Sequence, residues 1–422
     1  MSKIGKGFLA ALTLTTLGFS GNALAYKAYA LGDHQALGIG GTVYAIDTDT
    51  NAIVGTVATD FGSANIAITP NGKSLYVGNS STLQVIDTAS LSVVKTFTSL
   101  HSSGQIAVSK DSATAYAQDI QNIYLLDTAR NTIKTTISGA WPSGIILSPD
   151  GNNGYIVGRW SVPSIAVLDI KTNHVWGAFY GFNDPKAGPS DNHPKSIMAI
   201  TPNGTKLFVA NIYISTVSVF TISDSSLIES ASIDVDSYPT SLLISPDGTK
   251  LYVANAGSNQ ADNGTVSVID TASNSMRQTI PLHAELGGIA ITPDGAKLYV
   301  TSLSNATVFV IDTASNTVAA TIDVPYKYSH LVDMAIASGS SGSPVQSQDC
   351  LFNWAEANYP GLFSPAGASD QLLPPYRYRY YRNTNSYVGV SSANNHVYYI
   401  GPDGNLQDVG DLSGWLATAN CQ

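Results

Sequence analysis

Short runs of alternating hydrophobic and polar residues recur along most of the chain. The string ITPDGAKLYVT begins at Ile291, close copies begin at Ile68, Ile200 and Ile244, and a worn copy begins at Leu147. Each run is rich in β-branched and aromatic residues, is too short for a helix and ends at turn residues. The pattern therefore predicts short strands that belong to an internal repeat.

A second phrase follows each copy of the first. It reads TVFVIDTASNTV from Thr307 and TVSVIDTASNSM from Thr265, with related strings from Leu83 and Ile123. Together the two phrases make a unit of about forty residues with four strands. Pro-Asp-Gly and Pro-Asn-Gly steps favour a tight turn between the first two strands, and Asp-Thr-Ala-Ser-Asn favours another between the last two. Such a unit is typical of a β-propeller blade.

The repeats predict seven blades. Six inner strands are expected around apolar anchors, and the seventh blade is expected to be split between the ends of the propeller. Strands two to four would come from the residues after Tyr26, and the inner strand from HLVDMAIAS at His330. This closure leaves no open sheet edge around the ring. The six anchors are Ile66, Ile106, Ile145, Met198, Leu242 and Ile289.

The second strands resemble those of the YVTN-type β-propeller repeat proteins. The matching strings begin at Tyr252, Phe208 and Tyr299, and the resemblance covers residues 26–338. It implies the propeller fold. Similar repeats occur in cell-surface layer proteins, lactonase-like enzymes, periplasmic dehydrogenases and nitrous oxide reductase, so the fold alone does not select a function.

The ends of the chain predict export and a second domain. Residues 1–25 contain two lysines, an apolar core and a small-x-small end, as a secretory signal peptide does. The apolar core is too short for a spanning helix, and no transmembrane segment is expected elsewhere. We therefore expect a propeller over residues 26–338, a flexible linker over 339–348 and a small domain over 349–422, in the periplasm, at the cell surface or outside the cell.

Charge excludes one class of partner. The formal net charge is −10, and loss of Lys3 and Lys6 with the signal peptide makes it two units more negative. A chain of this charge does not favour nucleic acid. Charged residues make up only 12% of the chain, which suits polar rather than ionic loops.

The last domain is predicted to be α+β. A helix is expected at CLFNWAEANYPGLF, then strands from Tyr376, Ser386 and His396, then a helix around Trp415. In YRYRYY the tyrosines and arginines alternate between two faces. The tyrosines either pack on the helices or bind a glycan or peptide.

The chain has 2 cysteines, Cys350 and Cys421, which bracket this domain. In an oxidising compartment we expect them to form a disulfide. The segment also resembles an accessory module found at the C-termini of secreted bacterial proteins, with its CLFNWAE start, YRYY strand and terminal Cys.

Common catalytic signatures are absent. The sequence has no nucleophile elbow of the Gly-x-Ser-x-Gly type, no Walker loop and no Cys-x-x-Cys-His haem site. The aspartate that recurs in Asp-Thr-x-x-Asn is predicted to brace a turn rather than to act as an acid.

Histidines provide the candidate ligand face. Most fall in loops that join successive blades or link strands two and three, and these loops share one side of a propeller. The long insertions at 182–194 and 256–264 fall on the same side, where function commonly resides. Imidazoles with neighbouring carboxylates could bind a divalent metal or a small polar ligand. The candidates are His34, His101, His193, His283, His330, Asp191 and Asp333.

Two interpretations of function follow. The first is an exported, non-enzymatic binding or scaffold protein with a protein, peptide or glycan partner and no cofactor. The alternative is a lactonase-like or metal-assisted enzyme that uses the same face. An enzyme needs acid, base or metal groups that converge in one pocket, whereas an interaction surface needs area and shape.

Overall fold

The computed structural model divides the chain into two compact units, one of which is Tyr26–Ser341. The first unit is described over 26–34, 40–60, 62–79, 81–98, 100, 104–158, 164–180, 198–223, 226–257, 263–325 and 330–337. The second is described over 368–373, 376–381, 386–391, 396–400 and 406–411. No helix of these residues is long and apolar enough to cross a membrane.

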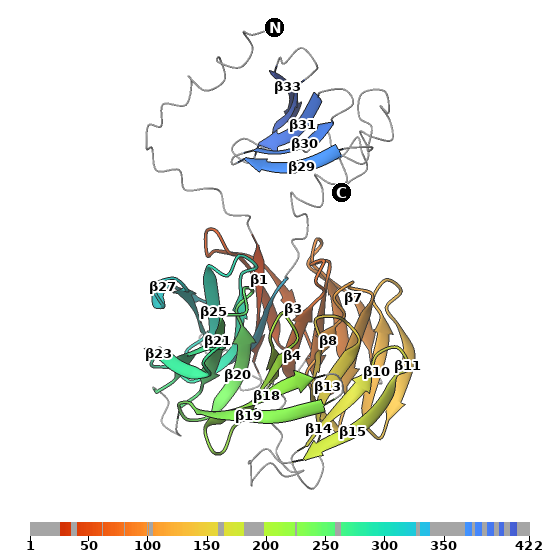
Figure 1. Ribbon diagram of the computed structural model, residues 1–422, viewed down its shortest axis with the longest axis vertical. Coiled ribbons are helices and arrows are strands. Elements are labelled where there is room, and N and C mark those ends of the chain that lie inside the picture. Colours follow the sequence, from red (N-terminus) through yellow and green to blue (C-terminus); the bar gives the residue numbers. More distant parts are fainter. Residues whose placement is uncertain are drawn as a thin grey trace. The chain divides into compact units, whose positions relative to one another are not determined.

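The first unit consists of seven four-stranded antiparallel sheets (Figure 1). Blade 1 has the order β28 (His330–Ile336), β1 (Lys27–Asp33), β2 (Thr42–Asp47), β3 (Ile53–Ala58). Blade 2 has β4 (Ser63–Ile68), β5 (Ser74–Asn79), β6 (Leu83–Asp87), β7 (Ser92–Phe97). Blade 3 has β8 (Ala107–Val108), β9 (Thr114–Gln118), β10 (Asn122–Asp127), β11 (Thr132–Ser138). Blade 4 has β12 (Pro142–Leu147), β13 (Asn153–Gly158), β14 (Ser164–Asp169), β15 (His174–Tyr180).

The remaining three blades repeat this order. Blade 5 has β16 (Met198–Ile200), β17 (Lys206–Asn211), β18 (Thr216–Ser223), β19 (Ser226–Asp234). Blade 6 has β20 (Pro239–Ile244), β21 (Lys250–Asn255), β22 (Thr265–Asp270), β23 (Ser275–Pro281). Blade 7 has β24 (Leu286–Ile291), β25 (Lys297–Ser302), β26 (Thr307–Asp312), β27 (Thr317–Asp323).

The first strands of the blades form a closed inner ring. Each contacts the first strand of the next blade, from β4 through β8, β12, β16, β20 and β24 to β28, and β28 contacts β4. In blade 1, β28 pairs antiparallel with β1, with Ala28 opposite Ile336 and Ala30 opposite Met334. The predicted seven blades and split-blade closure are confirmed.

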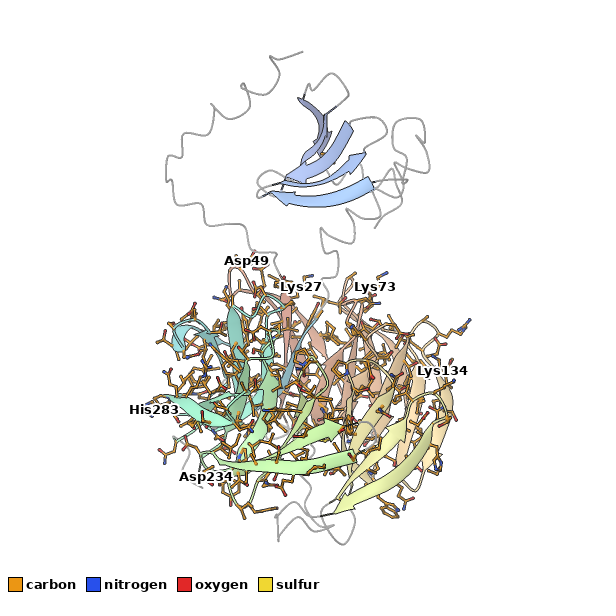
Figure 2. The ribbon with its side chains drawn as sticks, viewed as in Figure 1. Lys27, Asp49, Lys73, Lys134, Asp234 and His283 are labelled. Carbon is orange, nitrogen blue, oxygen red and sulfur yellow. The ribbon has the colours of Figure 1, made fainter. Side chains whose placement is uncertain are left out.

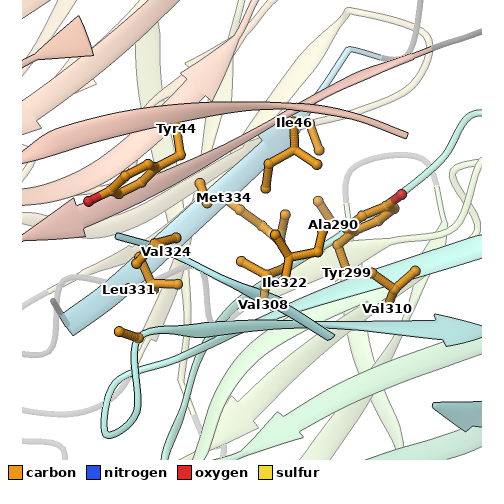
Figure 3. Close-up of a cluster of buried hydrophobic side chains, with 13 residues drawn as sticks. Tyr44, Ile46, Ala290, Tyr299, Val308, Val310, Ile322, Val324, Leu331 and Met334 are labelled. Atoms are coloured by element: carbon orange, nitrogen blue, oxygen red, sulfur yellow. The ribbon is translucent and has the colours of Figure 1, made fainter. Parts of the chain in front are cut away.

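Hydrophobic clusters at the seams between blades hold the ring together. The seam of blades 7 and 1 buries Tyr44 and Ile46 from β2 against Val308 and Val310 from β26 (Figure 3). Clusters of the same kind occupy the other seams. The predicted inner-strand anchors are buried, with exposed fractions of 7% or less. Side chains alternate between two neighbouring blades along a strand, so every central strand stabilises two seams.

The antiparallel order gives the propeller two faces. Turns between strands one and two and between strands three and four form what we call the base face. Turns between strands two and three, with the loops that join blades, form the entry face. Base turns use residues with positive φ, for example Gly248 (φ 75°) after Asp247 and Asn316 (φ 53°) after Asp-Thr-Ala-Ser. These are the positions where Gly and Asn avoid strain.

The recurring aspartates brace the base turns, as predicted. Asp312 Oδ1 accepts the backbone N–H of Ser315 (2.8 Å) and its hydroxyl (2.8 Å). Hydrogen bonds from the backbone and side chain of Ser315 lower the pKa of Asp312. Equivalent bonds are made by Asp47, Asp87, Asp127, Asp169 and Asp270.

Lysines link three consecutive seams at the base. Lys206 Nζ donates to the carbonyl of Thr271 in the next blade (2.6 Å), and Lys250 Nζ does the same to Thr313 (2.6 Å). Lys297 Nζ donates to the carbonyl of Thr48, which also accepts from the Tyr299 hydroxyl (3.3 Å). Blades 5, 6, 7 and 1 are thus joined by one repeated contact.

The second unit contains a five-stranded antiparallel sheet. Its order is β29 (Ala368–Leu373), β30 (Tyr376–Tyr381), β31 (Ser386–Ser391), β32 (His396–Ile400), β33 (Leu406–Asp411). The three expected strands are present, and β29 and β33 extend the sheet on both sides, beyond the prediction. The two expected helices and both cysteines lie outside the described residues, so these expectations and the disulfide stay predictions.

Candidate functional site

His34 lies on the entry face, as predicted, but it is buried. It directly follows β1, is 1% exposed, and its Nε2 lies 3.1 Å from Thr42 Oγ1. Burial lowers the pKa of His34, while the nearby Asp33 acts in the opposite direction. The ring is therefore neutral at pH 7 and packs within blade 1, with Gly32 leaving it space.

His283 and His330 are exposed on the entry face. His283 lies in the loop between β23 and β24 with φ 52°, and it is at the margin of the propeller in Figure 2. His330 is the first residue of β28, opposite Asp33 of β1, so it belongs to the inner strand itself.

Asp333 lies in inner strand β28 and bridges two blades. Its Oδ2 accepts the backbone N–H of Ile66 in β4 (3.2 Å), and its Oδ1 accepts that of Met334 (2.9 Å). Gln105 makes the same kind of bridge from blade 3 to Ile145 of blade 4 (3.3 Å). These bonds show that Asp333 supports the inner ring.

The other candidates, His101, His193 and Asp191, lie outside the described residues. Among the residues that are described, no three of His, Cys, Asp or Glu lie together as a metal site requires. The metal hypothesis for the full set stays a prediction.

Charge is segregated between the two faces of the described propeller. The base face holds both signs, as the labels Lys27, Lys73 and Asp49 on one side of Figure 2 illustrate. Its ion pairs include Arg277 with Asp270 and Arg130 with Asp127. The described entry face has no Lys or Arg, whereas its carboxylates are Asp33, Asp60, Asp119, Asp234, Asp236, Glu285 and Asp323.

Exposed large hydrophobic side chains are restricted to two regions of the described propeller. In the described part of the propeller they lie on the outermost strands, such as Val94 and Met276, or in entry-face loops. The loop residues are Ile120, Trp141, Ile214 and Tyr238, and no described base turn exposes such a side chain. Elaborated, apolar loops on a rigid scaffold are typical of a contact surface.

Two of these residues are aromatic and hold an unusual backbone conformation. Trp141 (φ 43°, 40% exposed) precedes β12, and Tyr238 (φ 58°, 37% exposed) precedes β20. The equivalent position before β4 is Gly62 (φ 75°). Positive φ is costly for bulky residues and is enriched at functional sites. The aromatic rings are therefore present where glycine would suit the backbone better.

The backbone of each aromatic residue is held in a loop region that also carries a carboxylate. The Trp141 N–H donates to the carbonyl of Gln121 (3.2 Å), whose own N–H donates to Asp119 Oδ1 (2.7 Å). Burial raises the pKa of Asp119, but hydrogen bonds from Tyr124 and Asn122 outweigh it and lower the pKa overall.

The Tyr238 loop is held in a similar way. Its carbonyl accepts the N–H of Ala256 (2.8 Å), and Asp236, two residues earlier, accepts the Thr265 hydroxyl (2.7 Å). The entry face thus contains two exposed aromatic residues whose loop regions also carry a carboxylate.

Comparison with known proteins supports the fold. No family model and no curated protein matches the chain. Among solved structures, Kuenenia stuttgartiensis hydrazine synthase is similar at a TM-score of 0.53 and 17% identity, over 82% of this chain and 95% of that one. The likeness shows the β-propeller. At this identity it carries no activity to this chain.

The prediction from histidines missed the aromatic positions. Both leave a signal in the sequence, because Trp141-Pro142 and Tyr238-Pro239 each place a large aromatic residue just before an inner strand. This sequence signal alone does not show that the two aromatic rings are exposed or that their backbone has a positive φ.

Proposed function

We propose that the chain is an exported, non-enzymatic binding protein whose propeller presents the entry face to a partner. The observation that carries this proposal is the distribution of exposed apolar loop residues, which occur on the entry face and on no described base turn. A soluble protein exposes such residues together mainly where something covers them.

The base face supports the proposal by contrast. Its aspartates accept turn N–H groups, and its lysines Lys206, Lys250 and Lys297 bind carbonyls of the next blade. The three lysines are engaged in joining neighbouring blades, so they are poorly placed to recognise a partner.

Cross-linking in the native cells tests the proposal. A photoreactive residue is placed at Ile214 on the entry face or at Lys73 on the base face, both exposed. We expect a discrete cross-linked product from position 214 and none from position 73. Equal products from both positions, or a product from position 73 alone, would contradict the proposal.

Export has its own test, because the mature N-terminus is measurable. Mass spectrometry of the chain recovered from the periplasm or the medium should find Tyr26 as the first residue. An intact terminus at Met1, in a chain recovered only from the cytoplasm, would contradict export.

The alternative is a metal-assisted enzyme, and the exposure of both His283 and His330 on the entry face favours it. It predicts about one equivalent of metal per natively purified chain. A content far below that, unchanged when the histidines are replaced, would exclude this alternative.

A further inference from the structure

We infer that the entry face binds a cationic segment of a partner protein, with Lys or Arg side chains seated at Trp141 and Tyr238. This inference rests on the proposed function and adds the chemistry of the partner. A cation is attracted both by the face of an aromatic ring and by a carboxylate, and the described entry face carries exposed groups of both kinds.

The first position lies where blades 3 and 4 meet. Trp141 is hydrogen bonded to the loop of Ile120 and Gln121, whose turn is braced by Asp119.

The second position lies between blades 5 and 6. Asp236 lies two residues before Tyr238 in sequence, and exposed Asp234 ends the preceding strand β19. Because the two positions belong to different seams, a single ion or small amine cannot occupy both. An extended segment with several cationic side chains can do so.

Charge over the whole face favours the same partner. The described entry-face loops contain carboxylates but no Lys or Arg. The negative electrostatic potential of such a face accelerates the association of cationic partners, and this effect weakens as salt screens it.

Calorimetry on the mature full chain tests the inference. The probes are an extended Lys- and Arg-rich peptide and a matched peptide with Gln at every cationic position. We expect the basic peptide to bind, its affinity to fall as salt rises, and the Gln peptide not to bind. Binding of both peptides alike, or of neither, would overturn the inference.

Variants then locate the binding. Trp141→Gly and Tyr238→Gly remove the rings at positions where the backbone suits glycine, so folding is preserved. Each should weaken binding roughly two- to fivefold. Asp234→Lys should weaken it further and flatten the salt dependence. Glu229→Lys, on outer strand β19, makes the same charge change away from the face and should leave binding unchanged.

The outcomes separate this inference from the proposed function. If Glu229→Lys weakens binding as much as the entry-face variants do, the attraction is unspecific and the inference fails. If Ile214 cross-links to a partner in cells but the basic peptide does not compete for it, the inference fails and the proposed function stands. If the basic peptide competes with the partner for cross-linking at Ile214 and the Gln peptide does not, the result supports both the inference and the proposed function.

Discussion

At the scale of single residues, equivalent tyrosines in different blades have different surroundings. Tyr76, Tyr252 and Tyr299 occupy the same place in their second strands and are fully buried. The hydroxyls of Tyr76 and Tyr252 have no hydrogen-bond partner in the described part of the chain, whereas Tyr299 donates to Asn51 Oδ1 (2.9 Å). Burial raises the pKa of Tyr76 and Tyr252 to about 12, so both stay neutral.

This difference predicts opposite effects of one substitution. Tyr299→Phe should destabilise the propeller by about 1 kcal/mol, because it leaves Asn51 without its donor. Tyr76→Phe should be neutral or stabilising, because it removes a buried hydroxyl that has no partner. Urea denaturation of the two variants measures both effects, and an equal loss of stability in each would refute the explanation.

At the scale of elements, the lysine contacts between blades predict where the ring is weakest. Lys297→Met should destabilise by about 2 kcal/mol, because a charged donor to the Thr48 carbonyl is lost where the split blade closes. Lys73→Met, at an exposed base turn, is the matched control and should change stability little. Thermal denaturation of both variants measures the difference in stability. Similar melting temperatures for the two variants would show that the Lys297 contact does not stabilise the ring.

The elements also show what could be predicted from the sequence. Repeated phrases specified the propeller strands and the return of His330–Ile336 to blade 1, since period, turn residues and anchors agree in most copies. Strands β29 and β33 were missed, because ASDQLL and LQDVGD are poor in β-branched and aromatic residues and their pairing partners decide their conformation. His34 was placed on the correct face, but burial depends on packing against Thr42 and was not predictable.

At the scale of the whole molecule, the base turns predict sensitivity to acid. Hydrogen bonds lower the pKa of Asp87, Asp150 and Asp312 from the ordinary value of 3.8. A carboxylate with a lowered pKa stabilises the fold above its ordinary pKa, and this contribution is lost as pH falls through the folded value. Burial raises the pKa of Asp49, so its contribution to the pH dependence of stability has the opposite sign. It is one group against three.

The melting temperature should therefore fall gently as pH drops below about 6.5, where the buried His34 resists protonation, and more steeply below about pH 4, where the base-turn aspartates are protonated. Asp312→Asn should lower stability at pH 7 and make the acid-induced loss less steep. A melting temperature that rises on acidification would contradict the account of the turns.

The central claim is that the entry face, and not the base or the outer strands, contacts the partner. Hydroxyl-radical footprinting of the chain in its native compartment and after purification tests it most directly. We predict that Trp141 and Tyr238 are protected from oxidation in the native compartment, while Met276 on outer strand β23 reacts equally in both states. Protection of Met276 with full reactivity of Trp141 and Tyr238 would contradict the claim.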